Sequence, residues 1–265
     1  QERKQILASQ NINLENQAKD VITNESEMAA KEEDVLKKVL SCNEYKTIFK
    51  KYLRQTPAYE NVTLDHIASA IMLYYADLSF YSSPFDEAMN KRRLLSADAV
   101  TGFNLFMGKA QCGTCHFVPQ FNGVKPPYTN SEFEVLGVPA SKTFQSLSND
   151  KGRYNINPVP EMVSAFRSGT VRNASFTKPY MHNGVFFTLE EVIDFYDTGG
   201  AAGKGLKIHN QTLSADSLKL TTNEKTKLIA FINALNEDIP LQKPPVSLPL
   251  SGNKSLNKRT IGGDY

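Results

Sequence analysis

The pentapeptide Cys112-Gly113-Thr114-Cys115-His116 decides how this chain of 265 residues is interpreted. Two thiols two residues apart, with a histidine directly after the second, form the attachment pattern of a c-type haem. The two sulfurs can form thioethers with the two vinyl groups of one porphyrin, and the adjacent imidazole can then bind its iron. The motif therefore predicts one covalently attached haem, held by Cys112, Cys115 and His116.

Other uses of a Cys-x-x-Cys pair fit the sequence less well. A structural zinc site needs a second pair of ligands, and the chain has only three cysteines and four histidines. A redox motif of the thioredoxin type requires alternating strands and helices around it, and that pattern is missing here. The third cysteine, Cys42, stands alone in a helical stretch, where we expect a buried and inert thiol.

Apolar residues recur at helical spacing on both sides of the motif. The expected helices span residues 31–53, 63–80, 96–110, 188–196 and 222–236. Thr63, Ser96 and Thr188 are the expected N-caps. Residues 117–160 are rich in Pro, Asn, Ser and Gly and lack periodicity, which is typical of a long loop that wraps a ligand. No segment alternates over the length of a strand, so the predicted class is mostly α.

The alternation of helical stretches and irregular stretches divides the chain into three parts. Residues 1–95 form a helical segment, residues 96–239 a cytochrome c-like haem domain with long irregular loops around the haem, and residues 240–265 an extended C-terminal tail. The chain begins at Gln1 without an initiator methionine, and we expect an upstream part of the protein.

Charge and hydropathy exclude several classes of function. There are 30 basic and 28 acidic side chains, which give a net charge of +2 and no electrostatic basis for binding nucleic acid or an anionic membrane. No apolar run is long enough to cross a bilayer. The hydrophobic content of 40% supports a packed core rather than disorder.

A haem iron bound by His116 has a sixth position to fill. The downstream candidates are Met162, Met181, His182, Tyr196 and His209. Methionine is the usual ligand of an electron-transfer haem and raises its reduction potential, whereas a tyrosinate lowers that potential. The residues alone leave this choice open.

Further motifs in the order found here give the chain a specific resemblance to a known family. They are Phe103-x-x-Phe106-x-Gly108-Lys109-Ala110, Thr170-Val-Arg-Asn-Ala-Ser-Phe-Thr-Lys-Pro-Tyr-Met-His-Asn-Gly184, Thr188-Leu-Glu-Glu-Val192 and the ending Lys258-Arg-x-x-Gly262-Gly-x-Tyr265. With the pentapeptide, they resemble the bacterial di-haem cytochrome c peroxidase family, including its MauG branch. The resemblance runs from about Asn13 to Asn236.

The resemblance implies two haems in two domains, and this chain matches the second. In family members the N-terminal haem reacts with hydrogen peroxide, and the C-terminal haem accepts electrons from a donor protein. The first attachment motif and the tryptophan between the haems are absent from this sequence. We therefore expect an N-terminal haem domain that is cleaved or lies outside this chain, with a one-haem descendant as the alternative.

Two side chains resemble part of the family's peroxide pocket. Gln17 and Glu27 match the pattern Leu-Glu-x-Gln followed by Asn-x-x-Glu-Met. The resemblance implies that both lie over the peroxidatic haem, with Glu27 as the acid–base catalyst of O–O cleavage. A carboxylate suits that task when a dry pocket shifts its pKa toward neutrality. Val21 replaces the family's proline between them, and two surface residues at a helix start are the alternative.

The resemblance also orders the candidates for the sixth ligand. The family methionine lies fourteen residues after the family histidine, and counting from His182 that position is Tyr196. MauG-type members place a tyrosine ligand in the corresponding helix. Tyr196 is therefore the leading ligand and Met181 the second, with a core tyrosine as the alternative for Tyr196. We expect His182 to line the pocket, and His66 and His209 to be solvated or capping residues.

Two further sites follow from the resemblance alone. Thr177 and Pro179 match positions whose backbone carbonyls bind a calcium ion between the haems, and oxygen ligands suit that hard cation. Arg172 matches an arginine near the haem carboxylates, whose charge a guanidinium offsets. A surface salt bridge is the alternative for Arg172.

The resulting hypothesis is the electron-transfer part of a periplasmic di-haem peroxidase. It would reduce hydrogen peroxide to water with electrons from a small cytochrome or cupredoxin, and covalent haem c, assembled outside the cytoplasm, implies the periplasm. The alternatives are a stand-alone mono-haem electron carrier, a MauG-like oxidase of a protein substrate, and a haem-bearing structural subunit. Family members are often homodimers, so a homodimer is a further expectation.

Overall fold

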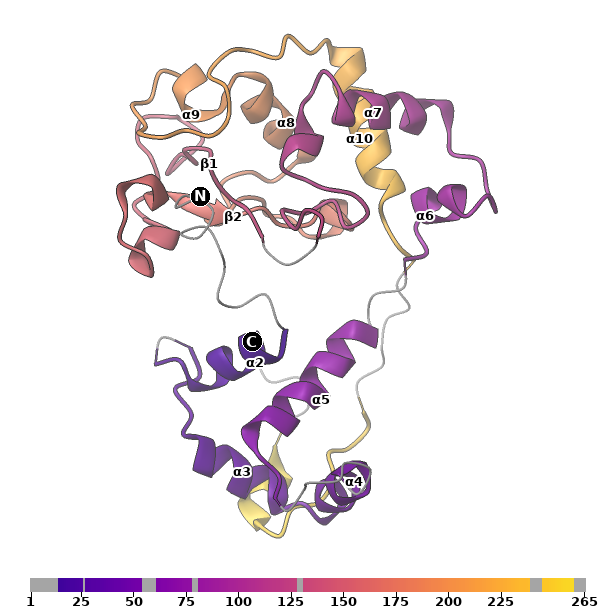
Figure 1. Cartoon of the computed structure of the whole chain (residues 1–265), viewed down its shortest axis with the longest axis vertical. Coiled ribbons are helices and arrows are strands. Elements are labelled where there is room, and N and C mark those ends of the chain that lie inside the picture. Colours follow the sequence, from indigo (N-terminus) through magenta and orange to yellow (C-terminus); the bar gives the residue numbers. More distant parts are fainter. Residues whose placement is uncertain are drawn as a thin grey trace. The chain divides into compact units, whose positions relative to one another are not determined.

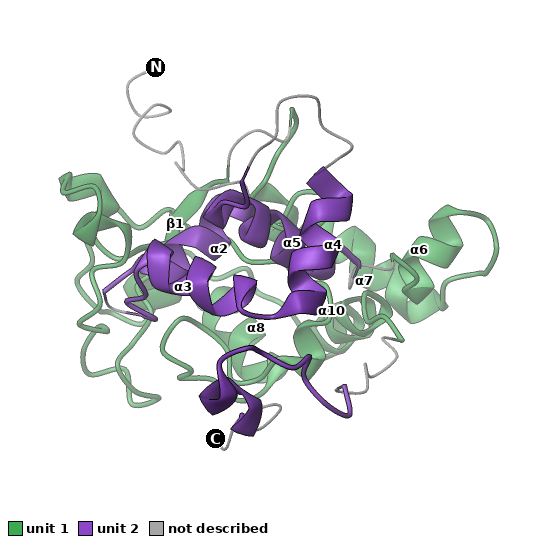
Figure 2. Ribbon diagram, turned by 90° about the horizontal axis from the view of Figure 1, so that it is seen from below, with its two compact units in different colours: residues 1–10, 81–238 green, residues 11–80, 239–265 purple. Residues whose placement is uncertain are grey.

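The computed structural model describes residues 14–25, 27–53, 61–77, 81–127, 131–238 and 245–259. The chain divides into two compact units (Figure 2). Unit 1 contains residues 81–238 together with residues 1–10, and unit 2 contains residues 11–80 and 239–265. Unit 1 begins before residue 96, the expected start of the haem domain, because Phe85 of the short helix α6 (Pro84–Met89) packs into the same aromatic core.

Helices dominate both units, and the mostly α class is confirmed (Figure 1). The other helices described in unit 1 are α7 (Ala97–Met107), α8 (Leu189–Asp197), α9 (Gly200–Gly203) and α10 (Thr222–Ala234). Those described in unit 2 are α2 (Leu14–Thr23), α3 (Glu32–Leu40), α4 (Asn43–Leu53) and α5 (Leu64–Asp77). Short 3-10 turns are η1 (Cys112–Thr114), η2 (Arg153–Asn155), η3 (Pro160–Met162), η4 (Ala174–Phe176) and η5 (Lys254–Lys258). Throughout the described ranges, every helix is too short or too polar to cross a bilayer.

The core of unit 1 is an aromatic cluster between α7 and α10. Phe106 of α7 and Phe231 of α10 are buried, and both contact the buried ring of Phe121 from the loop after the cysteine motif. The ring centroids lie 5.2 to 5.9 Å apart at interplanar angles of 65 to 81°. This edge-to-face geometry is the one that aromatic pairs prefer. Burial of each ring stabilises the unit by roughly 1.5–3 kcal/mol relative to an exposed ring.

Helices α7 and α10 pack at very short distance around Gly102. A Cβ atom at Gly102 would lie 2.0 Å from the carbonyl oxygen of Lys227 and 2.7 Å from Cβ of Phe231. The first of these neighbours is backbone within a helix and cannot rotate away. The absence of a side chain at Gly102 is therefore what lets the two helices approach.

Local capping signals place the helix starts of unit 1. The Ser96 hydroxyl accepts a hydrogen bond of 3.2 Å from the first turn of α7. Thr188 and Glu191 form a capping box at the start of α8, with distances of 3.2 and 3.3 Å. Both predicted N-caps are confirmed. At α5, the Thr63 amide instead donates to Nδ1 of His66 at 3.0 Å, so His66 is a capping residue as expected.

A short antiparallel strand pair lies in a region without alternation in the sequence. Strand β1 (Phe133–Val135) pairs with β2 (Ala165–Arg167), and Glu134 stands opposite Phe166. Three residues are too few to show the period of two that identifies a strand. The expectation of irregular chain is corrected at this point.

In unit 2, the predicted helix over residues 31–53 is broken at Ser41 and Cys42. The Ser41 carbonyl accepts a hydrogen bond of 2.7 Å from the Gly252 amide, and Cys42 pairs with Ser251 in an isolated bridge. The C-terminal tail is thereby attached to the junction between α3 and α4. Cys42 is 3% exposed, so the prediction of a buried thiol is confirmed.

Parts of the expected elements lie outside the described residues. They are residues 1–13, 26, 54–60 and 78–80 of the N-terminal segment, residues 128–130 and 239 of the predicted haem domain, and residues 240–244 and 260–265 of the tail.

We expect Gly102→Ala to lower the free energy of unfolding by about 1–3 kcal/mol or more, because the new methyl group overlaps a backbone carbonyl. Chemical denaturation of the haem-loaded chain measures the change. Gly169→Ala is the matched control, since no described atom lies within 4 Å of a Cβ built there. Equal stability of the two variants would contradict the close crossing of α7 and α10.

Candidate haem site

The cysteine motif folds into one tight turn directly after α7. The amides of Cys115 and His116 both donate to the carbonyl of Cys112, at 3.2 and 2.9 Å. Gln111 adopts a left-handed conformation that turns the chain out of α7. A Cβ at Gly113 would lie 2.7 Å from the Met107 sulfur, so the turn packs against the end of the helix. The two sulfurs and the imidazole thus share one short, fixed segment.

His116 is prepared to bind a metal through Nε2. Its Nδ1 lies 3.1 Å from the carbonyl oxygen of Phe121, and a carbonyl only accepts, so Nδ1 carries the proton. Burial lowers the pKa of His116, which keeps the imidazole neutral. A neutral imidazole with its Nδ1 proton engaged presents the Nε2 lone pair to iron.

The two thiols are protonated as well. Burial raises the pKa of Cys112 to about 12 and that of Cys115 to about 11, and the Glu134 carboxylate adds to the second increase. Uncharged thiols of this kind are compatible with sulfurs that end as neutral thioethers.

Tyr196 lies in the last turn of α8 and belongs to the same site. Burial raises the pKa of its hydroxyl, and the nearby Cys112, Cys115 and Glu134 raise it further. The charges of Cys112, Cys115 and Glu134 thus influence the Tyr196 hydroxyl. The role of Tyr196 as a haem ligand stays a prediction.

Glu134 is a site residue that the sequence analysis missed. It lies on β1, whose neighbouring side chains Phe133 and Val135 pack with Met162 and Ala165. Side chains alternate along a strand, so Glu134 points to the opposite face. Its position is set by strand pairing over a long sequence separation, and the short stretch around it carries no recognisable motif.

The two methionine candidates lie in apolar packing. Met181 adopts a left-handed backbone conformation with φ of 67°, and it packs on a cluster that includes Val185, Phe186 and Phe195. Met162 is 1% exposed in the smaller cluster beside β1.

The histidine candidates have other neighbours. The His182 ring stacks on Phe166 at a centroid distance of 3.6 Å, and its Nε2 lies 3.0 Å from the Ser148 hydroxyl. His209 is exposed to solvent. These positions fit a lining residue and a solvated residue, respectively.

Arg172 makes a buried ion pair with Asp86 rather than a surface one. Its two terminal nitrogens donate to the Asp86 carboxylate at 2.8 and 2.7 Å, and Nε donates to the Pro119 carbonyl at 3.1 Å. Burial by itself would raise the pKa of Asp86, but the hydrogen bonds from Arg172 and Ser83 outweigh it and lower the pKa. The Glu237 carboxylate lies 3.8 Å from a terminal nitrogen of Arg172. Arg172 thus connects α6 to the loop that contains Pro119. A contact of Arg172 with haem carboxylates stays a prediction.

The remaining predicted site residues are exposed. Gln17 lies on α2 of unit 2 and Glu27 lies after it, whereas Thr177 and Pro179 lie after η4 in unit 1. Their proposed roles involve a further haem or the carbonyl oxygens of a loop, and these roles stay predictions.

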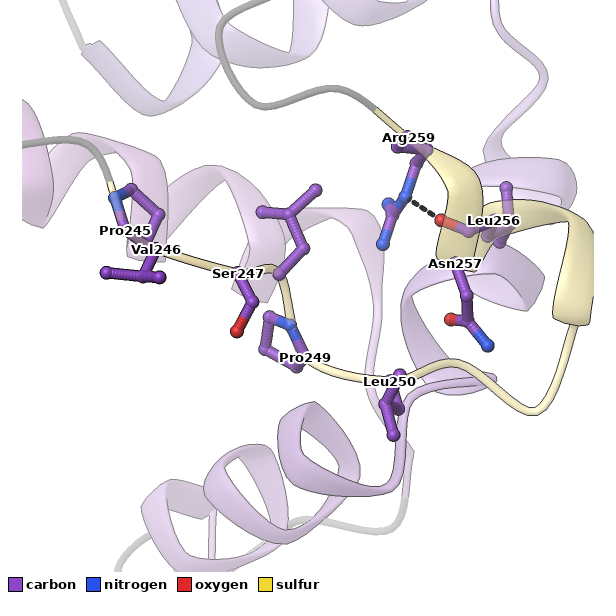
Figure 3. Close-up of a pocket in the computed structure, with 9 residues that line it drawn as sticks. Pro245, Val246, Ser247, Pro249, Leu250, Leu256, Asn257 and Arg259 are labelled. Atoms are coloured by element: carbon purple, nitrogen blue, oxygen red, sulfur yellow. Dashed lines mark hydrogen bonds between the residues drawn. The ribbon is translucent and has the colours of Figure 1, made fainter.

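A hollow of about 480 Å³ lies in the C-terminal tail (Figure 3). Its lining residues are Pro245, Val246, Ser247, Leu248, Pro249, Leu250, Leu256, Asn257 and Arg259. Arg259 is the one charged side chain among them, and its Nε donates to the Leu256 carbonyl at 2.5 Å. The lining holds the Ser247 hydroxyl but no carboxylate, imidazole or thiol that could serve as its general base.

Comparisons with known proteins identify the family. A family profile described as "Di-haem cytochrome c peroxidase" matches residues 1–93. The chain is 34% identical to cytochrome-c peroxidase IdrP1 of Pseudomonas sp. (strain SCT) over 191 residues, which is 63% of this chain and 47% of that protein. It is 30% identical to cytochrome c551 peroxidase of Nitrosomonas europaea over 241 residues, which is 91% of this chain and 63% of that protein.

A solved structure shares the fold. A MauG-like protein associated with microbial copper homeostasis superposes with a TM-score of 0.68 at 23% identity, over 87% of this chain and 71% of that one. The chain spans about half to two thirds of the length of the curated relatives described above. With a cysteine turn, a prepared histidine and these relatives, the chain belongs to the di-haem cytochrome c peroxidase/MauG family, which binds haem c.

Proposed function

We propose that this chain carries the electron-transfer haem of a peroxidase that reduces hydrogen peroxide to water. The electrons would come from a small cytochrome or cupredoxin, in the periplasm. The observation that carries the proposal is the single turn that holds Cys112, Cys115 and His116, in which the His116 ring is oriented by the Phe121 carbonyl. These three residues, together with Tyr196 in the same unit, would hold one haem covalently and supply ligands to its iron.

Each residue has a defined task toward the haem. Cys112 and Cys115 would hold it through thioethers, and His116 would bind the iron through Nε2. When bound, the haem supplies reversible one-electron transfer. The hydrogen bond from Nδ1 of His116 to the Phe121 carbonyl fixes the ring orientation and raises the basicity of Nε2.

Tyr196 would act as an anionic ligand. Its buried hydroxyl holds its proton in the protein alone, because burial raises the pKa. To hold the haem iron as a tyrosinate, Tyr196 would first have to give its Oη proton to water or another base. A tyrosinate ligand would favour the oxidised metal and lower the reduction potential relative to a methionine ligand.

The peroxide chemistry would take place at a second haem, in a domain to the N-terminal side. Gln17 and Glu27 would lie over that haem, and Glu27 would carry the proton from one peroxide oxygen to the other. Both side chains are exposed in unit 2 and so are open to such a domain. The carbonyls of Thr177 and Pro179 would bind Ca²⁺, and Arg172 would offset the charge of haem carboxylates.

A second candidate function is a stand-alone electron carrier with one haem. It is favoured by the single Cys-x-x-Cys-His motif in the sequence. The haem count of the purified protein, taken with the intact mass of every polypeptide in it, separates the two. Two haems with two polypeptides support the peroxidase, whereas one haem and no peroxide turnover support the carrier.

We expect one covalent haem per chain after expression in a host competent for cytochrome c maturation. Intact mass and the pyridine haemochrome spectrum measure it. The double variant Cys112→Ser/Cys115→Ser should lose the haem completely. Cys42→Ser is the matched control and should keep it, because Cys42 is buried in unit 2. Colourless wild-type protein with free thiols at both positions would exclude the proposal.

We expect Tyr196→Phe to keep the haem attached but to change its spin state and raise its reduction potential, because the anionic ligand is lost. Absorption and EPR spectra with a redox titration measure this. Tyr180→Phe serves as control, since Tyr180 packs on the neighbouring apolar cluster. Spectra identical to wild type in Tyr196→Phe would remove Tyr196 as a ligand.

We expect Glu27→Gln to lower peroxide turnover about a hundredfold or more while leaving the spectrum of the haem in this chain unchanged, as for loss of an acid–base catalyst. The assay follows oxidation of a reduced small cytochrome by hydrogen peroxide in the complete purified protein. The exposed Glu25, in Glu25→Gln, is the control and should keep full turnover. Equal turnover in both variants would argue against a role for Glu27.

A further inference from the structure

A lysine on α10 pairs with two carboxylates in the last turn of α8, the helix that carries Tyr196. Nζ of Lys225 lies 2.7 Å from Oδ1 of Asp194 and 2.6 Å from Oδ2 of Asp197. Both carboxylates belong to the last turn of α8, and Tyr196 stands between them in the chain. One ammonium group therefore connects α10 to Asp197, which directly follows the proposed ligand, and to Asp194, two residues before it.

Asp197 is fixed by its other atoms as well. Its second carboxylate oxygen accepts a buried hydrogen bond of 3.0 Å from the Leu220 amide, and its backbone carbonyl accepts one of 2.9 Å from the Leu218 amide. The Asp197 side chain is 11% exposed, so these contacts are largely protected from water. The residue after Tyr196 is thus attached to the segment that leads into α10.

Helix α8 depends on such contacts for its position. It has nine residues, and a helix of that length is marginal by itself in water, so tertiary contacts determine where it lies. The capping box at Thr188 fixes its first turn. Lys225 and Asp197 fix its last turn, which is the turn that contains Tyr196.

We propose that Lys225 is a positioning residue for the haem ligand: by holding Asp194 and Asp197, it keeps Tyr196 in reach of the iron. The inference rests on the proposed role of Tyr196. Without the ammonium group, the last turn of α8 is less restrained, and Tyr196 dissociates from the iron more often. An external ligand would then compete with Tyr196 more easily.

Imidazole affinity measures this competition directly. The apparent affinity of an external ligand is reduced by the fraction of protein in which the internal ligand blocks the site. In the ferric, haem-loaded full chain at constant pH, we expect Lys225→Met to bind imidazole about tenfold more tightly than wild type. Lys225→Arg should stay close to wild type, because it keeps the charge.

Lys227→Met is the matched control. Lys227 lies on the same helix, its Nζ is 2.6 Å from Asp98, and its side chain is 23% exposed, compared with 24% for Lys225. Asp98 belongs to α7, so this pair does not touch α8. Its imidazole affinity should match wild type. An equal increase in both variants would mean general loosening of α10 and would overturn the inference.

A double variant shows whether Lys225 acts through Tyr196. In the Tyr196→Phe background, Lys225→Met should not change imidazole affinity further, because the internal ligand is already gone. Should Lys225→Met fail to fold, Asp197→Asn replaces it, since an amide oxygen can still accept from Leu220 but no longer pairs with the ammonium group.

The outcomes separate two failures. If Tyr196→Phe tightens imidazole binding and Lys225→Met does not, Tyr196 remains a ligand and the positioning role is wrong. If Tyr196→Phe itself leaves the affinity unchanged, Tyr196 is not a ligand, and both the ligand and the positioning role are overturned.

Discussion

The contact between His116 and the backbone of Phe121 is the point on which the site depends. The imidazole donates through Nδ1 to a carbonyl whose own residue is completely buried, with a ring that contacts both Phe106 and Phe231. The core between α7 and α10 therefore determines the orientation of His116, the proposed iron ligand. A displaced Phe121 would turn His116, even with the cysteine turn intact.

Tyr196 is positioned by the same helix pair through different contacts. Tyr196 lies on α8, which is joined to α10 through Lys225, and α10 packs against α7 around Gly102. Both proposed axial ligands thus take their positions from α10, one through an apolar core and the other through ion pairs. The first kind of contact tolerates salt and the second is partly screened by it. The contacts that position His116 are therefore less sensitive to salt than the ion pairs that position Tyr196.

Sequence alone was sufficient where the governing interaction is local. The N-caps at Ser96 and Thr188 and the cysteine turn depend on residues within a few positions of each other, and they are recognised by type and spacing. The break at Ser41 was missed because its cause is the tail, through Gly252, and apolar periodicity continues across it. The two-stranded sheet was missed because three residues are too few to show alternation.

The side-chain partners within the site could not be predicted from the sequence, because they too are far apart in the chain. The ion pair of Arg172 joins residues 86 positions apart, and Glu134 reaches the cysteine turn only through strand pairing. Neither the partner of Arg172 nor Glu134 lies in a recognisable sequence motif. The family resemblance led to a different expectation for Arg172, a contact with haem carboxylates. Tyr196 could be ranked by resemblance, but the influence of Cys112 and Cys115 on the pKa of its hydroxyl depends on the tertiary structure.

Burial explains why this site suits a covalently attached group. It keeps the two thiols, the tyrosine hydroxyl and the imidazole in their neutral forms at once. The neutral imidazole of His116 keeps a lone pair for a metal, whereas protonated thiols would first have to lose their protons to bind one. Thioethers formed by Cys112 and Cys115 would carry no charge, so a covalently held haem would leave no thiolate in this environment of low polarity.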